Sequence, residues 1–172
     1  MQLVICIRKE GEETKLELYI SLIQLISFLQ LISFLKCFYD SSKQKKALII
    51  YQESLRIKRD SLGDDHFEVA KTLYLIGLLY NILRNYTDAL NSLKEALTIT
   101  VKAFATDHSL VGDIHTGLGQ IHMSKCQYDE ANHEFKAGLK VYKACKLGDG
   151  NDKVISVLNA MHRAEHEKEI IV

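Results

Sequence analysis

Histidine is the side chain with the widest chemistry in this sequence, because imidazole binds metals and exchanges protons near neutral pH. His162 and His166 lie four residues apart, a spacing that places two metal ligands on one face of a helix. Glu165 and Glu167 would point to other sides of that helix, so no third ligand completes the set. The pattern is typical of a solvated helix face, and we expect no metal and no cofactor.

The other histidines at recurring positions favour structural roles. His66 and His108 each follow an aspartate where a helix is expected to begin, which indicates capping or local packing. His115 and His122 fall on an expected packing face, where a buried histidine normally finds a hydrogen-bond partner. A metal-dependent or enzyme-accessory activity centred on the histidines is kept only as an alternative.

The sequence contains no motif for nucleophilic or phosphate chemistry. Gly117 and Gly119 follow no strand and so form no phosphate loop, and there is no Gly-x-Ser-x-Gly. The four cysteines are scattered without a Cys-x-x-Cys pair, which is typical of thiols in a reducing compartment. We expect no catalytic residues, a protein that is not an enzyme, and a cytoplasmic location.

The composition favours a helical globular chain. Of the 172 residues, 47% are apolar and none is proline, so a core can form and no helix interior is broken by a proline ring. The 22 Lys and Arg residues are balanced by 22 Asp and Glu. A net charge of zero creates no general attraction for phosphate, and we expect no nucleic-acid binding.

An internal repeat organises the chain. Ala47, Ala89 and Ala131 lie 42 residues apart (89 − 47 and 131 − 89). The residues that coincide at the same spacing include Tyr51, Leu93 and Phe135; Leu55, Leu97 and Leu139; Gly77 and Gly119; Val69 and Val111; and Asp65-His66 and Asp107-His108. A period of this length is typical of stacked supersecondary units.

Each period contains two amphipathic helices. In the second period, small or apolar residues recur at helical spacing from Val69 to Tyr80 and again from Ala89 to Leu97. The helices are expected to break at Arg84-Asn85, and the repeats at residues 62–65, with Asp65 as N-cap and Glu68 completing a capping box.

The positions of Gly77, Tyr80, Ala89 and Ala96 resemble those of the tetratricopeptide repeat, and residues 62–90 are similar to the long repeat of kinesin light chains. The resemblance implies an all-α, right-handed superhelical solenoid of helix–turn–helix repeats with a C-terminal capping helix. The expected divisions are an N-terminal extension over residues 1–30 and a repeat domain over residues 31–170, with repeats at about 31–62, 63–104 and 105–146 and a partial repeat at 147–170.

Several positions depart from the long repeat. Arg84 and Cys126 replace the glycine that ends the first helix, at a cost of about 1 kcal/mol each if the residue is left-handed. In the partial repeat, Val154, Leu158 and Met161 match the packing residues of earlier repeats, and a polar end follows, as a capping helix requires.

The N-terminal extension leaves three interpretations open. The run from Leu18 to Leu35 carries no charge and is just long enough to span a membrane, but it contains two glutamines and three serines. It could be a buried helix, a membrane anchor with the repeats facing the cytosol, or an artefact of the gene start.

The resemblance also implies a function, because the first helices of such repeats line a concave groove that holds a partner peptide or helix. We therefore expect a protein–protein interaction scaffold or adaptor. The groove of this protein is expected to have a mixed apolar and amide lining, which suits a peptide with apolar anchors rather than a chaperone tail. The residues expected to face the groove are Lys71, Tyr74, Leu78, Asn81 and Ile82 in the second repeat, Asp113, Thr116, Gln120, Met123 and Ser124 in the third, and Ser156, Asn159, Arg163 and His166 in the fourth.

Overall fold

The computed structural model describes residues 42–106 and 108–171, and Gln44–Val172 form one compact unit. The expected first helix of the first repeat at 31–40, and the uncharged run from Leu18 to Leu35, lie outside the described residues. Within the described part, no helix has the length and apolar character needed to cross a membrane.

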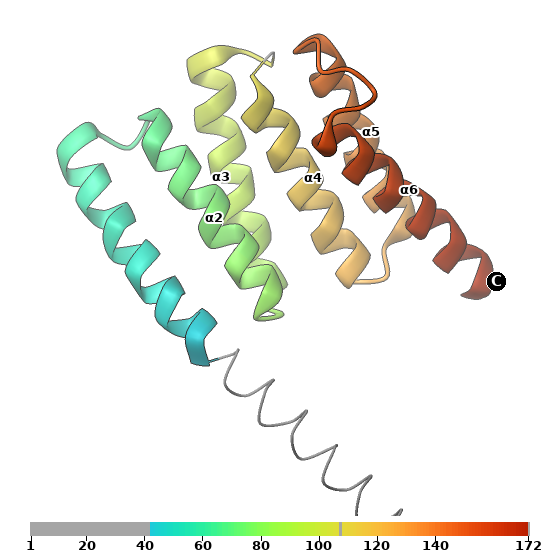
Figure 1. The fold of residues 1–172 in the computed structure, drawn as a ribbon. Helices are drawn as coiled ribbons and strands as arrows, with labels where there is room; N and C mark the ends of the chain where they lie inside the picture. Colours follow the sequence, from blue (N-terminus) through green and yellow to red (C-terminus); the bar gives the residue numbers. More distant parts are fainter. Residues whose placement is uncertain (1–41, 107, 172) are drawn as a thin grey trace, which may run out of the picture. The chain divides into compact units, whose positions relative to one another are not determined.

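Paired antiparallel helices stack in sequence order along the described part of the chain (Figure 1). The helices are residues 42–62, α2 (Phe67–Ile82), α3 (Tyr86–Phe104), α4 (Ser109–Ser124), α5 (Tyr128–Ala144) and α6 (Asp152–Ile171). Pairs form between α2 and α3 and between α4 and α5, and α2, α4 and α6 also contact one another in turn. The predicted all-α solenoid of helical repeats is therefore confirmed.

Small residues allow the helices within each pair to approach closely. A Cβ atom added to Gly77 would lie 2.8 Å from the Leu93 side chain, and one added to Gly119 would lie 2.5 Å from the Phe135 ring. Ala89 and Ala131 are completely buried. The large side chain of one helix thus fills the space that the glycine of its partner leaves, as the repeat pattern predicts.

The first helix of each complete pair ends in a left-handed residue. Arg84 and Cys126 have φ angles of 60° and 58°. The amide of the next residue bonds back to the carbonyl five positions earlier, from Asn85 to Tyr80 and from Gln127 to His122, which is the Schellman pattern. Both positions thus adopt the left-handed conformation of the glycine that they replace, and the condition under which the sequence predicts a cost of about 1 kcal/mol at each is met.

Histidines begin the first helices. The Nδ1 atoms of His66 and His108 accept hydrogen bonds from the backbone N–H groups of Glu68 and Leu110, both at 3.1 Å, so the expected capping role is confirmed. The prediction of Asp65 as N-cap is wrong by one residue. Its carboxylate instead pairs with Lys102.

One residue of the capping helix α6 departs from the expected packing. Val154, Val157, Ala160 and Ala164 form its buried face, whereas Leu158 is 44% exposed. The matching residue of the second repeat, Leu73, is buried in the cluster that includes Ala89 and Leu93 of α3. Leu158 is exposed because, among the described helices, none packs on α6 as α3 packs on α2.

Candidate functional site

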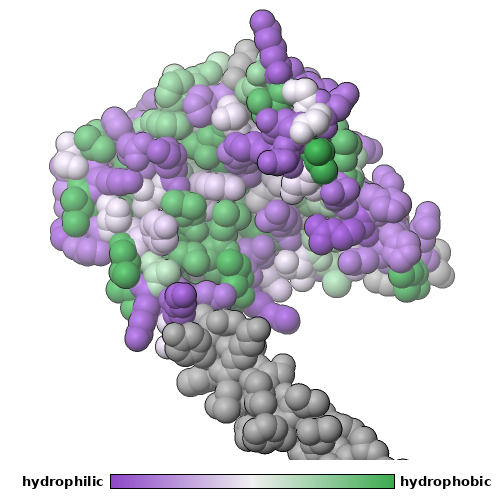
Figure 2. Space-filling model, in the orientation of Figure 1, coloured by the Kyte–Doolittle hydropathy of each residue, from purple (hydrophilic) through white to green (hydrophobic). Residues whose placement is uncertain are grey.

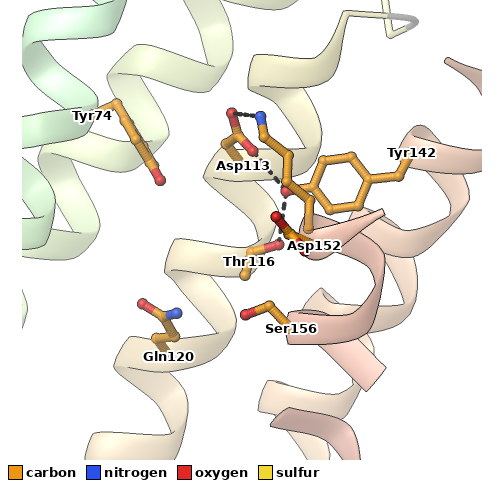
Figure 3. A pocket seen from close by; sticks show the side chains of 8 residues that line it. Tyr74, Asp113, Thr116, Gln120, Tyr142, Asp152 and Ser156 are labelled. Atoms are coloured by element: carbon orange, nitrogen blue, oxygen red, sulfur yellow. Dashed lines mark hydrogen bonds and ion pairs between the residues drawn. The ribbon is translucent and has the colours of Figure 1, made fainter. Parts of the chain in front are cut away.

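A polar pocket of about 360 Å³ lies where four helices meet (Figure 3). It is open on one side to solvent, so a ligand could enter without rearrangement of the helices. Its lining comprises Tyr74 from α2; Asp113, Thr116 and Gln120 from α4; Tyr142 from α5; and Asp152, Lys153 and Ser156 from α6.

Two residues of the third repeat differ from their counterparts in the second repeat, and together they create the pocket. In the second repeat the two positions hold Ala70 and Thr100, and 42 residues later they hold Gly112 and Tyr142. A Cβ atom on Gly112 would lie only 2.4 Å from Tyr142 Cε1, so the ring fits because the glycine has no side chain. The Tyr142 ring can therefore extend past α4 into the pocket. Tyr142 lies on α5, the second helix of its repeat, whereas the other lining residues lie on first helices.

Asp113 is the centre of the hydrogen-bond network. Its Oδ1 accepts from the Tyr142 hydroxyl at 2.7 Å, and its Oδ2 accepts from Lys153 Nζ at 2.7 Å. The Lys153 ammonium also lies 5.8 Å from the centre of the Tyr142 ring. Burial, together with the hydrogen bond to Asp113, raises the pKa of Tyr142, so its hydroxyl keeps the proton that it donates.

Tyr74 forms the α2 side of the pocket. Its side chain is half-buried against the core, and its hydroxyl points toward the open space in Figure 3. Burial, with the nearby charge of Asp113, raises the pKa of Tyr74 to about 12. The phenol therefore stays neutral at physiological pH and can both donate and accept a hydrogen bond.

Three further polar side chains face the pocket from α4 and α6. Gln120 and Ser156 approach each other from opposite sides, and Asp152 stands at the first turn of α6 (Figure 3). All three residues are exposed, and none of the three side chains has a hydrogen-bond or ion-pair partner among the described residues; Ser124 bonds only to the backbone carbonyl of Gln120. These groups are therefore available to a ligand.

The structure brings together five residues of the expected groove: Tyr74, Asp113, Thr116, Gln120 and Ser156. Leu78 lies beside Tyr74, since a Cβ atom on Gly117 would be 3.4 Å from Leu78 and 3.7 Å from Tyr74.

The other expected groove residues of α2 and α4 lie outside this pocket. Lys71 is exposed, pairs with Glu68 at 2.8 Å and lies over the Phe67 ring. Ile82 is 55% exposed, Ser124 is exposed, and Asn81 is half-buried. Met123 packs against the cluster that contains Phe135, so it is partly a core residue.

An apolar strip adjoins the pocket. Figure 2 shows hydrophobic residues gathered over α2 on the face where α2, α4 and α6 lie in front, while hydrophilic residues dominate over α6. We call the three α2 residues Tyr74, Leu78 and Ile82 the α2 strip. This face combines one apolar side with one polar pocket, which suits a peptide better than a single small molecule.

Sequence reasoning missed Tyr142, Asp152 and Lys153. The last two begin a helix after a one-residue insertion, where the register with earlier repeats is least certain. The sequence does contain a signal for Tyr142. Where the second repeat has Thr100, the third has this large aromatic residue, and where the second has Ala70, the third has Gly112, which has no side chain.

The core histidines are satisfied by local partners. His115 Nδ1 lies 2.7 Å from Glu134 Oε2, and His122 Nδ1 lies 3.1 Å from Gln127 Oε1. The hydrogen bond from His115 is the main cause that lowers the pKa of Glu134. In the part of the chain that the structure describes, no three His, Cys, Asp or Glu residues are grouped as metal ligands.

Stacked helix pairs with an exposed first-helix face define a helical-repeat scaffold for protein interactions. The tetratricopeptide-repeat family matches residues 37–100 and 68–144, and the chain belongs to this family. Its fold is similar to that of BtubC (BKLC) from P. vanneervenii, with a TM-score of 0.59 and 20% identity over 73% of this chain. The match covers 54% of BtubC, so this chain spans about half the length of that protein.

The predicted likeness to kinesin-light-chain repeats is borne out by the same two findings. No curated protein sequence matches this chain.

Proposed function

We propose that this chain is a non-catalytic adaptor that holds an extended peptide or a helix of a partner protein in its groove, in the cytoplasm. The observation that supports it most directly is the junction of the α2 strip with the polar pocket on one exposed face. Apolar side chains of the strip would provide contact area, and the pocket would fix the register of the partner.

The pocket groups are suited to binding rather than to reaction. Both carboxylate oxygens of Asp113 accept hydrogen bonds, and the Lys153 ammonium is engaged by that same carboxylate. Asp113 and Lys153 are therefore held in a fixed hydrogen-bonded ion pair, which suits a positioning role better than that of a free base. We propose on this ground that the protein is not an enzyme.

A quantitative pull-down with the full-length chain tests the groove. Gln120→Lys places a long charged side chain at the mouth of the pocket, where Gln120 is exposed and its replacement costs little stability. Partners held in the groove should be depleted about tenfold, the effect of losing roughly 1.4 kcal/mol of binding free energy. Lys94→Glu on the exposed side of α3 is the control and should retain every partner.

Tyr74→Ala is the second groove variant. As a half-buried aromatic anchor, Tyr74 should contribute about 2 kcal/mol to binding, but its contacts with the core mean that the free energy of unfolding falls as well. Tyr74→Phe keeps the packing and removes only the hydroxyl. If both groove positions can be changed without loss of any partner, the groove proposal is refuted.

A further inference from the structure

The charges in the pocket do not balance. Asp113 and Lys153 neutralise each other through a 2.7 Å ion pair. The second carboxylate, Asp152, has no cationic partner among the described residues. The three charged residues of the pocket thus sum to a formal charge of −1, and the Asp152 carboxylate is stabilised only by water and the N-terminus of α6. The pocket favours a cationic group over an anionic or apolar one, because an apolar ligand would remove water from that carboxylate without replacing it.

The polar groups of the pocket are also dispersed. The Tyr74 hydroxyl, the Gln120 amide oxygen and the Ser156 hydroxyl can all accept hydrogen bonds, and they come from three different helices. A planar guanidinium has five N–H donors in a fixed fork and can serve several separated acceptors, whereas an ammonium is a compact point charge. Tyr74 adds an aromatic ring beside the same space, on which a guanidinium can stack.

The size of the pocket fits one side chain. About 360 Å³ is near the lower limit of the roughly 300–1,000 Å³ typical of small-molecule sites. Tyr74 belongs to both the pocket lining and the α2 strip, so a peptide that inserts one long side chain can rest apolar residues on α2.

We propose that the pocket between α2, α4, α5 and α6 binds an arginine side chain of the partner peptide, with Asp152 as the counter-ion and an apolar residue of the same peptide on the α2 strip. This inference rests on the proposed groove function and adds the chemistry of the partner to it. Asp113 and Lys153 act as positioning residues that hold the Tyr142 ring and the start of α6 in place.

Selection from a random peptide phage library, with the full-length chain immobilised, tests the inference. Arginine should be enriched at one fixed position of the selected peptides. A resynthesised peptide with citrulline in place of that arginine keeps the shape but loses the charge. It should bind about tenfold more weakly, the loss expected for a charged hydrogen-bonded pair worth roughly 1.4 kcal/mol.

Two variants of Asp152, with a control variant at Asp149, assign the effect to the pocket. In Asp152→Asn the preference for arginine over citrulline should disappear, whereas Asp149→Asn removes the same charge from the exposed preceding loop and should preserve it. Asp152→Lys should prefer a glutamate in place of the arginine. Circular dichroism and the melting temperature of each variant check that α6 is still folded.

The outcomes separate the two proposals. Peptides that bind and are lost with Gln120→Lys, but show no arginine enrichment, overturn the arginine site and leave the groove function standing. Equal binding of lysine and arginine peptides, or an arginine preference unaffected by Asp152→Asn, also overturns the site as stated. If the wild-type chain selects no peptide at all, both proposals fail.

Discussion

The Gly112–Tyr142 contact makes a double-mutant cycle possible, because the second repeat already contains the alternative pair Ala70 and Thr100. Gly112→Ala, Tyr142→Thr and the double variant convert the third repeat stepwise to the pair of the second. The glycine variant alone adds a methyl group 2.4 Å from Cε1 and 2.7 Å from Cδ1 of the ring, so the ring must move by about 1 Å to reach van der Waals distance.

The expected free energies follow from these contacts. Strain from the added methyl group should cost about 1–3 kcal/mol, and the better helix propensity of alanine should return about 1 kcal/mol. Tyr142→Thr removes a ring whose residue is only 2% exposed, and we expect a loss of about 3 kcal/mol. In the double variant the strain is absent, so its loss should be smaller than the sum of the single losses by about 2 kcal/mol.

Urea unfolding of the full-length chain, followed by circular dichroism at helical wavelengths, measures the four free energies of unfolding. Tyr142→Phe is a useful fifth protein, because it keeps the ring over Gly112 and removes only the hydroxyl that Asp113 accepts from. Additivity within about 0.5 kcal/mol would show that the two residues do not compete for the same space, and our account of how the pocket forms would be wrong.

Three further predictions concern the repeats. Arg84→Gly and Cys126→Gly should each raise the free energy of unfolding by about 0.5–1 kcal/mol, because their positive φ angles strain any residue with a Cβ; a loss in urea unfolding would contradict this. His108→Ala should lower the melting temperature by removing about 1 kcal/mol of capping, and His108→Asn should largely restore it. Ala89→Leu should cost about 1–3 kcal/mol by overpacking, against under about 0.5 kcal/mol for Lys94→Ala; equal losses in urea unfolding would refute the assigned faces.

The 42-residue repeat predicted the helix pairs correctly, because the residues that recur are those that pack one helix against its partner. Gly77 and Leu93 must stay in phase if two helices are to approach closely, and such constraints leave a visible pattern. Helix caps leave a weaker pattern. Asp65 and His66 are adjacent and both can cap, and only the backbone geometry decides that the imidazole faces the Glu68 amide.

The pocket was only half predictable for a related reason. Tyr74, Asp113, Thr116 and Gln120 lie on first helices, and the register assigns that face to the groove. Tyr142 lies on a second helix, which the same register assigns to the far side. Its ring reaches the pocket only because Gly112 has no side chain in the way. A periodic pattern describes each position separately, so it does not reveal that a change at residue 142 depends on a change at residue 112.

The position of α6 connects binding to local unfolding. Among the described helices, α6 contacts only α5 and α4, yet it supplies three of the eight residues that line the pocket. Detachment of α6 would therefore open the pocket while leaving α2 to α5 packed, and amide hydrogens of α6 should exchange with solvent faster than those of α4. A peptide bound in the pocket would slow exchange along α6, including turns that it never touches, because it binds only the attached state.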